Sequence, residues 1–144
     1  MLSADDIMLV RASFARVMPV KDAAADLFYA RLFTVAPQLR RMFPADLRGQ
    51  KQKLMAMIAT AVGALHDLDA LVPKVKALGM RHATYGATPE HYQVVGDVLL
   101  LTLERALGDA FTPQVRAAWT NVYGVLAATM QAGAAEIGQM QAAE

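Results

Sequence analysis

The chain has 144 residues, of which 56% are hydrophobic and 19% are charged. This length and balance fit one globular domain (residues 1–144) with a sizeable core, and they exclude a disordered chain. A net charge of +1 gives no overall excess for binding nucleic acid or an anionic membrane. The absence of cysteine excludes disulfides, zinc-finger spacings and a cysteine nucleophile, and it agrees with a reducing compartment.

Neither a targeting signal nor a membrane span is predicted. The first ten residues, MLSADDIMLV, carry acids where a signal peptide needs basic residues. The longest apolar stretch, VVGDVLLLTLERAL, is interrupted by Asp97 and Glu104 and falls short of the ~20 residues that a span requires. We therefore expect a cytoplasmic protein.

Apolar residues recur with a helical period of about 3.6 through most of the chain, and no window alternates with the period of a strand. The six prolines separate the periodic segments, and each is expected between helices or in a helix's first turn. Ser3 with Asp6, and the pairs Thr88-Pro89 and Thr112-Pro113, are typical helix starts. Helices are predicted over 4–18, 20–35, 48–65, from Asp69 to about 83, 89–107 and 113–137, with a short turn ending at Pro44.

The same periodicity predicts the buried positions. Trp119 and the nine methionines are expected to fill the core, because methionine adapts to irregular gaps. Five basic residues between 40 and 53 are expected on a solvated face, namely Arg40, Arg41, Arg48, Lys51 and Lys53. The predicted buried faces are Ala24, Leu27, Phe28, Ala30 and Leu32; Leu54, Ile58, Ala61 and Leu65; and Val115, Trp119, Val122, Leu126 and Met130.

The sequence thus predicts an all-α domain of six or seven helices. A four-helix bundle would need fewer helices of more even length, joined by short loops. Short helices between two early and two long late ones suit a fold packed around a pocket.

One histidine stands on an apolar stripe. Leu71, Val75 and Leu78 recur at helical spacing, and four residues further lies His82. Such a histidine is usually a core residue bonded to a backbone carbonyl. His66 and His91 look solvated, and no acid lies at metal-ligand spacing from His82. A metal held by this histidine alone would take its other ligands from a cofactor, and haem is the common case.

Six segments together resemble the single-domain bacterial globins and the globin domain of flavohaemoglobins, over essentially the whole chain. Each segment alone is a weak signal, but their order and spacing are specific. The resemblance implies a three-on-three globin fold around haem b, iron protoporphyrin IX. The segments are LFYARLF (27–33), RRMFP (40–44), GQKQKLM (49–55), LVPKVKALGMRHATYG (71–86), PEHYQVVGDVLL (89–100) and AWTNVYGVLA (118–127).

The resemblance also implies site residues. His82 matches the proximal ligand of the haem iron, Phe43 the phenylalanine that packs on the haem, and Tyr92 the tyrosine that approaches the proximal histidine from the next helix. Some of the basic residues between 40 and 53 would meet the haem propionates, and the sequence does not say which.

On the other side of the haem, Tyr29 matches the distal tyrosine, Gln50 the distal glutamine and Leu54 the apolar residue over the iron. Taken alone, Tyr29 could be ordinary core packing and Gln50 a solvated residue at a helix start.

The chain departs from flavohaemoglobins at one position. A glutamate on their last helix joins the proximal histidine and the neighbouring tyrosine, and the matching residue here is Ala134. Glu136 lies two residues on, which is about 200° around a helix, so we expect it to face away from the proximal site. The departure weakens the case for peroxidase-like chemistry, because that network strengthens electron donation to iron.

Three functions remain open from the sequence. The first is reversible O₂ binding, with CO and NO as further ligands and hydrogen bonds from Tyr29 and Gln50 making O₂ binding tight. The second is an NO dioxygenase that makes nitrate and depends on an external reductase, with Tyr29 and Gln50 as its catalytic residues. The third is a haem-based sensor or a cofactor-free interaction protein. Either a monomer or a homodimer is compatible with this sequence.

Overall fold

The computed structural model describes the backbone of residues 2–143 and the side chains of residues 2–136. Within this range the chain forms six α-helices with three short 3₁₀ helices and no strand. The α-helices are α1 (Ala4–Val17), α2 (Lys21–Val35), α3 (Arg48–Gly63), α4 (Leu68–Thr84), α5 (Pro89–Leu107) and α6 (Pro113–Ala143). The 3₁₀ helices are η1 (Met18–Val20), η2 (Pro37–Met42) and η3 (Gly108–Ala110).

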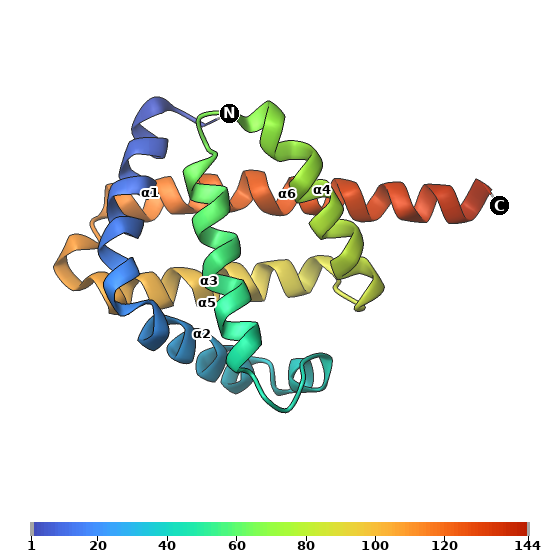
Figure 1. Cartoon of the computed structure of the whole chain (residues 1–144), viewed down its shortest axis with the longest axis horizontal. Helices are drawn as coiled ribbons and strands as arrows, with labels where there is room; N and C mark the ends of the chain where they lie inside the picture. The colour runs from blue at the N-terminus through green and yellow to red at the C-terminus, as the bar shows by residue number, and fades with distance from the viewer. Residues whose placement is uncertain (1, 144) are drawn as a thin grey trace.

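The helices cross in two layers, with α1, α3 and α4 running across α5 and α6 (Figure 1). Helix α2 packs against both α3 and α5, and α4 packs mainly on α6. This arrangement confirms the predicted all-α, three-on-three architecture. None of the helices in the described part of the chain is long and apolar enough to cross a bilayer.

Capping residues explain where several helices begin. The Ser3 hydroxyl accepts from the Asp6 N–H at 3.0 Å while the Asp6 carboxylate accepts from the Ser3 N–H, which is the predicted capping box. The Asp67 carboxylate caps α4 by accepting from the Ala70 N–H at 3.3 Å. These contacts satisfy N–H groups that have no partner inside the helix.

Two helix predictions were wrong in detail. Helix α6 continues to Ala143 instead of ending near residue 137, because its last stretch, with two alanine pairs, is rich in helix formers. Pro73 lies inside α4 and not in its first turn. As the sixth helical residue it removes only one backbone hydrogen bond close to the helix start.

The core divides into two clusters. The larger joins α1, α2, α3, α5 and α6 around Trp119, whose indole N–H donates to the Ser13 hydroxyl at 2.8 Å. The smaller joins α2, η2 and α5 around Phe28, Tyr29 and Leu32. Trp119 is therefore in the core, as predicted.

Some predicted core residues are not buried. Ala30 is exposed, because it lies on the outer side of α2. Met8, Met18 and Met57 are also exposed, so the methionines do not all fill the core. On α3 the most buried residues are Met55 and Val62, while the predicted Leu54, Ile58 and Ala61 are half-buried. Of the five basic residues predicted to be solvated, Arg40 and Lys51 are half-buried, because both side chains bind neighbouring groups.

Helices α4 and α6 approach each other through two glycines. A Cβ atom built on Gly79 would overlap the backbone carbonyl of Met130, and one on Gly133 would overlap the backbone of Lys76. Each glycine lies three residues from the backbone that the other one meets. The position of α4 on α6 is therefore set by backbone contact, which any larger side chain would prevent.

Candidate functional site

The predicted distal residues Tyr29 and Gln50 are in contact. Tyr29 is buried on α2, with 3% of its surface exposed. Gln50 lies in the first turn of α3, and its amide Nε2 donates to the Tyr29 hydroxyl oxygen at 3.2 Å. Burial raises the pKa of Tyr29, and the hydrogen bond from Gln50 opposes the rise in part. The tyrosine therefore stays neutral at ordinary pH and keeps its hydroxyl proton for another acceptor.

Phe43 belongs to an aromatic cluster with Tyr29. Its ring lies edge-on to Tyr29, with 5.7 Å between ring centroids, and edge-on to Phe33 at 5.4 Å. The Arg40 guanidinium lies 5.2 Å from the centroid of the Phe33 ring and donates to the carbonyl of Pro44 at 2.9 Å. Arg40 thus fixes both the turn after Phe43 and the ring beside it.

The sequence analysis did not predict that Phe33 belongs to this aromatic cluster, or that Arg40 contacts both the Phe33 ring and the Pro44 carbonyl. The signal for Phe33 was its spacing of four from Tyr29, which puts both rings on one side of α2. Arg40 had no comparable signal, because its acceptors are backbone carbonyls in an irregular segment.

His82 lies near the end of α4 and is half-buried. Its ring Nδ1 is 2.8 Å from the Leu78 carbonyl oxygen. A carbonyl can only accept, so Nδ1 carries the hydrogen and Nε2 is left with a lone pair. Among the described residues no three His, Cys, Asp or Glu side chains gather as a metal site. The donor set on α4 therefore fits a metal that brings most of its own ligands.

Tyr92 lies in the first turns of α5 with a buried hydroxyl that has no hydrogen-bond partner. Burial also raises its pKa. A buried polar group without a partner is costly and rare. No hydrogen bond joins Tyr92 to the His82 ring in the part of the chain that the structure describes. The orphan hydroxyl indicates that this region accommodates a group with an acceptor of its own.

Tyr123 of α6 supports the Tyr92 backbone from behind. Its hydroxyl donates to the Tyr92 carbonyl. Its ring packs against Gly96 so closely that a Cβ atom added to this glycine would lie 2.6 Å from Tyr123 Cε2. Burial strongly raises the pKa of Tyr123. Gly96 thereby lets the α6 tyrosine reach the start of α5.

Glu136 makes no hydrogen bond with the His82 ring among the described side chains, but it does not face away from α4, the helix that carries His82. It turns toward α4, where its Oε1 accepts from Lys76 Nζ at 2.8 Å, six residues before His82. Ala134 is half-buried. Glu136 therefore anchors α4 to α6 and makes no hydrogen bond to the His82 ring.

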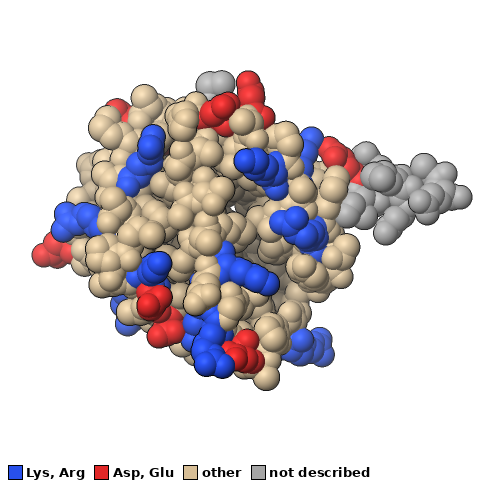
Figure 2. Space-filling view, in the orientation of Figure 1, with Lys and Arg blue, Asp and Glu red and all other residues tan. Residues whose placement is uncertain are grey.

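The distal group and His82 belong to different parts of the fold. Tyr29, Phe43 and Leu54 share one apolar cluster, whereas His82 belongs to α4, which rests on α6. Figure 2 shows a hollow between α3 and α4. A neutral histidine with a free ring nitrogen on α4, a buried tyrosine hydroxyl on α2 and an orphan hydroxyl on α5 are groups that fit a cofactor such as haem.

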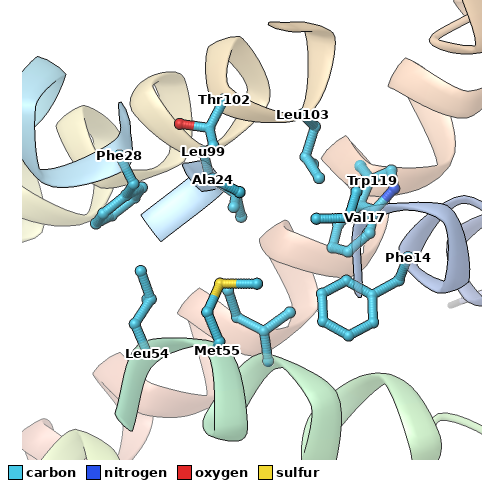
Figure 3. Close-up of a pocket in the computed structure, with 11 residues that line it drawn as sticks. Phe14, Val17, Ala24, Phe28, Leu54, Met55, Leu99, Thr102, Leu103 and Trp119 are labelled. Atoms are coloured by element: carbon cyan, nitrogen blue, oxygen red, sulfur yellow. The ribbon is translucent and has the colours of Figure 1, made fainter. Parts of the chain in front are cut away.

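Leu54 also borders a second, apolar cavity behind the distal wall (Figure 3). The cavity has a volume of about 20 Å³. Its one polar lining residue, Thr102, donates its hydroxyl to the Val98 carbonyl at 2.8 Å. Water would find no partner there, so the cavity is dry. It is lined from five α-helices, with Phe14, Phe28, Leu54, Met55, Leu103 and Trp119 pointing into it.

Comparison with known families and proteins agrees with this geometry. The Globin family model matches residues 26–130. A flavohemoprotein of Bacillus subtilis is 32% identical over 130 residues, which covers 88% of this chain and 33% of the relative. A neuroglobin of Tetraodon nigroviridis is 32% identical over 155 residues, which covers 98% of both chains. This chain thus spans about a third of the length of the flavohemoprotein and nearly the whole neuroglobin.

A solved structure has the same architecture. It is an engineered carbene transferase made from a putative nitric oxide dioxygenase of Rhodothermus marinus, with a TM-score of 0.86 and 26% sequence identity. The match covers 99% of each chain.

Proposed function

Because this chain belongs to the globin family, whose cofactor is haem, we propose that it binds haem b through His82 and reversibly binds O₂. The haem, when bound, supplies a ferrous iron with one open position for O₂, CO or NO. The chain's own residues then decide how firmly each gas is held.

On the proximal side, His82 would hold the iron through Nε2. The Leu78 carbonyl, 2.8 Å from Nδ1, fixes the tautomer and the orientation of the ring. Phe43 would pack on the face of the macrocycle, held by its contacts with Tyr29 and Phe33. The unpaired hydroxyl of Tyr92 would donate a hydrogen bond to an acceptor on the bound group.

On the distal side, one observation carries the proposal for O₂: Gln50 donates to the Tyr29 oxygen at 3.2 Å. Since that oxygen already accepts from Gln50, the Tyr29 proton is left for another acceptor, and a ligand on the iron would be that acceptor. A ligand that gains negative charge, as O₂ does, is stabilised by such a donor. Hydrogen bonds to charged groups contribute roughly 1.5–3 kcal/mol, so tight O₂ binding is expected. CO gains less charge and should gain less affinity.

NO dioxygenase activity is the second candidate, because the solved structure at 26% identity derives from a putative nitric oxide dioxygenase and several relatives are flavohemoproteins. In that reaction NO and O₂ combine to nitrate and a reductase restores ferrous iron. Tyr29 and Gln50 would then hold the O₂ for attack by NO.

The first test is the absorption spectrum of the purified protein, reduced and then exposed to CO. A Soret band that shifts with CO is expected. His82→Ala should remain helical but lose the haem or bind it weakly, whereas His66→Ala, at an exposed position, should keep the normal spectrum. Normal haem bands in His82→Ala would contradict the assignment of His82.

The second test separates the two functions. NO is supplied repeatedly to the reduced protein under O₂, with a reductase and its nicotinamide cofactor present, and nitrate is counted per haem. An O₂ carrier should stop after about one nitrate per haem, and an NO dioxygenase should continue over many cycles.

A further inference from the structure

The balanced net charge of the chain conceals a separation of charge along it. Residues 37–85, which include η2, α3 and α4, contain eight Lys and Arg against three Asp, a net charge of +5. The rest of the chain contains six Lys and Arg against ten Asp and Glu, a net charge of −4. The segment from η2 to α4 is therefore basic, and the remainder of the chain is acidic.

Four of these cations are exposed and lie outside every ion pair among the described side chains: Arg41, Lys53, Lys74 and Arg81. We call them the basic rim. Three nearby acids bind other cations, since Asp26 pairs with Lys51, Asp46 with Arg48 and Glu136 with Lys76. Asp67 and Asp69, at the start of α4, pair with none of the rim cations among the described side chains, and both are already counted in the net charge of +5. The rim thus keeps its charge available to an outside partner.

The rim is placed around the hollow. Lys53 directly precedes Leu54 on α3, and Arg81 directly precedes His82 on α4, so each lies beside a residue of the candidate site. Lys74 lies eight residues, or about two turns, before His82 on α4 and is exposed. Figure 2 shows Lys and Arg side chains on both sides of the hollow, over α3 and α4, with the acids mostly near the edges of this face.

We propose that the basic rim is a docking surface for an acidic electron-carrier protein that reduces the haem iron through the hollow. The proposal rests on the proposed haem site between α3 and α4. Each reduction moves one electron, so the carrier is oxidised by one electron as ferric iron becomes ferrous. Two haem propionates would lower the +5 of residues 37–85 to about +3 and leave the surface basic.

Complementary charge at such a surface acts mainly on the rate of association. It steers the partner to the reactive face and can raise association rates by 10- to 1,000-fold, an effect that salt removes. A carrier held at the rim would also stand at the opening nearest to the cofactor.

The experiment uses flavodoxin, an acidic flavin protein, as the probe. Binding of oxidised flavodoxin to the haem-loaded protein is measured by titration calorimetry at 10 and 200 mM NaCl. Reduction of the ferric protein by reduced flavodoxin is followed by stopped-flow absorption. We expect both the affinity and the second-order rate constant to fall at least tenfold at the higher salt concentration.

Two triple variants with the same net charge locate the surface. The rim variant carries Lys53→Glu, Lys74→Glu and Arg81→Glu. The control variant carries Arg11→Glu, Arg16→Glu and Arg105→Glu, three exposed cations on α1 and α5 that lie in no ion pair among the described residues. At 10 mM NaCl the rim variant should lose at least tenfold in affinity and rate, and the control should stay within threefold of the wild type.

Three outcomes would overturn the proposal. Equal losses in the two variants would mean that only net charge matters. No loss in either would mean that the carrier docks elsewhere. Loss of haem from the rim variant would mean that these cations bind the haem propionates and not a partner protein. Reduction with dithionite followed by CO tests the haem site without any partner, so that site can stand even if the docking surface fails.

Discussion

The two walls of the hollow are built in different ways. Helix α3 meets its neighbours through side chains, with the Gln50 amide on Tyr29 and Lys51 Nζ on Asp26 at 2.8 Å. Helix α4 meets α6 through backbone, at Gly79 and Gly133. Side-chain contacts can be exchanged one at a time, whereas a backbone contact admits no added atom. The distal wall is thus the adjustable one, and the proximal wall holds His82 in one place.

Adding a methyl group at the helix crossing should test this difference most severely. Gly79→Ala forces a Cβ against the Met130 carbonyl, and overpacking of this kind typically costs about 1–3 kcal/mol. We expect a loss of stability at the upper end of that range in urea unfolding, because backbone cannot move aside as a side chain can. The ferrous iron–histidine stretching band should also shift in resonance Raman spectra, because His82 follows one turn later.

Gly124→Ala is the matched control on α6, since nothing lies within 4 Å of a Cβ at that position. It should stabilise the helix by about 0.5–1 kcal/mol, because alanine is the better helix former. Equal effects of the two substitutions would refute the role of backbone contact at Gly79.

The distal wall should show its effect in ligand release instead. Tyr29→Phe removes the proposed hydrogen-bond donor to O₂ and keeps the buried ring, so the fold should change little. We expect O₂ to dissociate about 10- to 150-fold faster, which corresponds to the loss of roughly 1.5–3 kcal/mol. Stopped-flow displacement of O₂ by CO measures the rate, and an unchanged rate would remove Tyr29 from the ligand site.

Gln50→Leu should have a smaller effect on the same rate than Tyr29→Phe. The amide acts on the tyrosine oxygen at 3.2 Å, so its loss leaves the Tyr29 proton in place but less well directed. A larger effect for Gln50→Leu would reverse the assigned roles.

Alkaline pH should weaken the fold through the buried tyrosines of α2 and α5. Burial raises the pKa of Tyr29 and of Tyr92 in the folded state, while an unfolded tyrosine titrates near 10. Above pH 10 the unfolded chain therefore releases protons that the folded chain keeps, and stability falls as pH rises. Each tyrosine contributes up to about 1.4 kcal/mol per pH unit in that window and nothing below it.

Urea unfolding at pH 8, 10 and 11 would measure this fall. Tyr29→Phe should make it shallower, and Tyr85→Phe, at a position 62% exposed, should not. Identical slopes for the two variants would mean that the burial of Tyr29 does not persist in solution.

The ion pair between α4 and α6 should matter least. Lys76 and Glu136 side chains are 36% and 42% exposed, and pairs at such positions contribute about 0–1 kcal/mol. We expect Glu136→Gln to lower the free energy of unfolding by less than about 1 kcal/mol, well below the effect of Gly79→Ala. The reverse order would mean that charge, and not the glycine contact, fixes α4.

The sequence by itself determined the order of the helices and most of their ends to within a few residues. These features depend on local rules, whereas the candidate site residues came from the resemblance to globins and remain predictions. Ser3 with Asp6 starts a helix wherever it lies, and apolar residues at spacing four must share one face of α4. The predicted end of α6 and the place of Pro73 failed because helix propensity and the cost of one lost hydrogen bond depend on neighbouring turns.

Only the tertiary structure decided how distant segments meet. The contact of Gly79 with Met130 joins residues far apart in the chain, and no local pattern distinguishes Gly79 from Gly124. The same is true of Glu136. Its position around the helix predicted that it does not join the histidine network, but it could not predict the ion pair with Lys76. The basic rim was likewise hidden in a net charge of +1, because the sign of a surface depends on which helices the fold places around one opening.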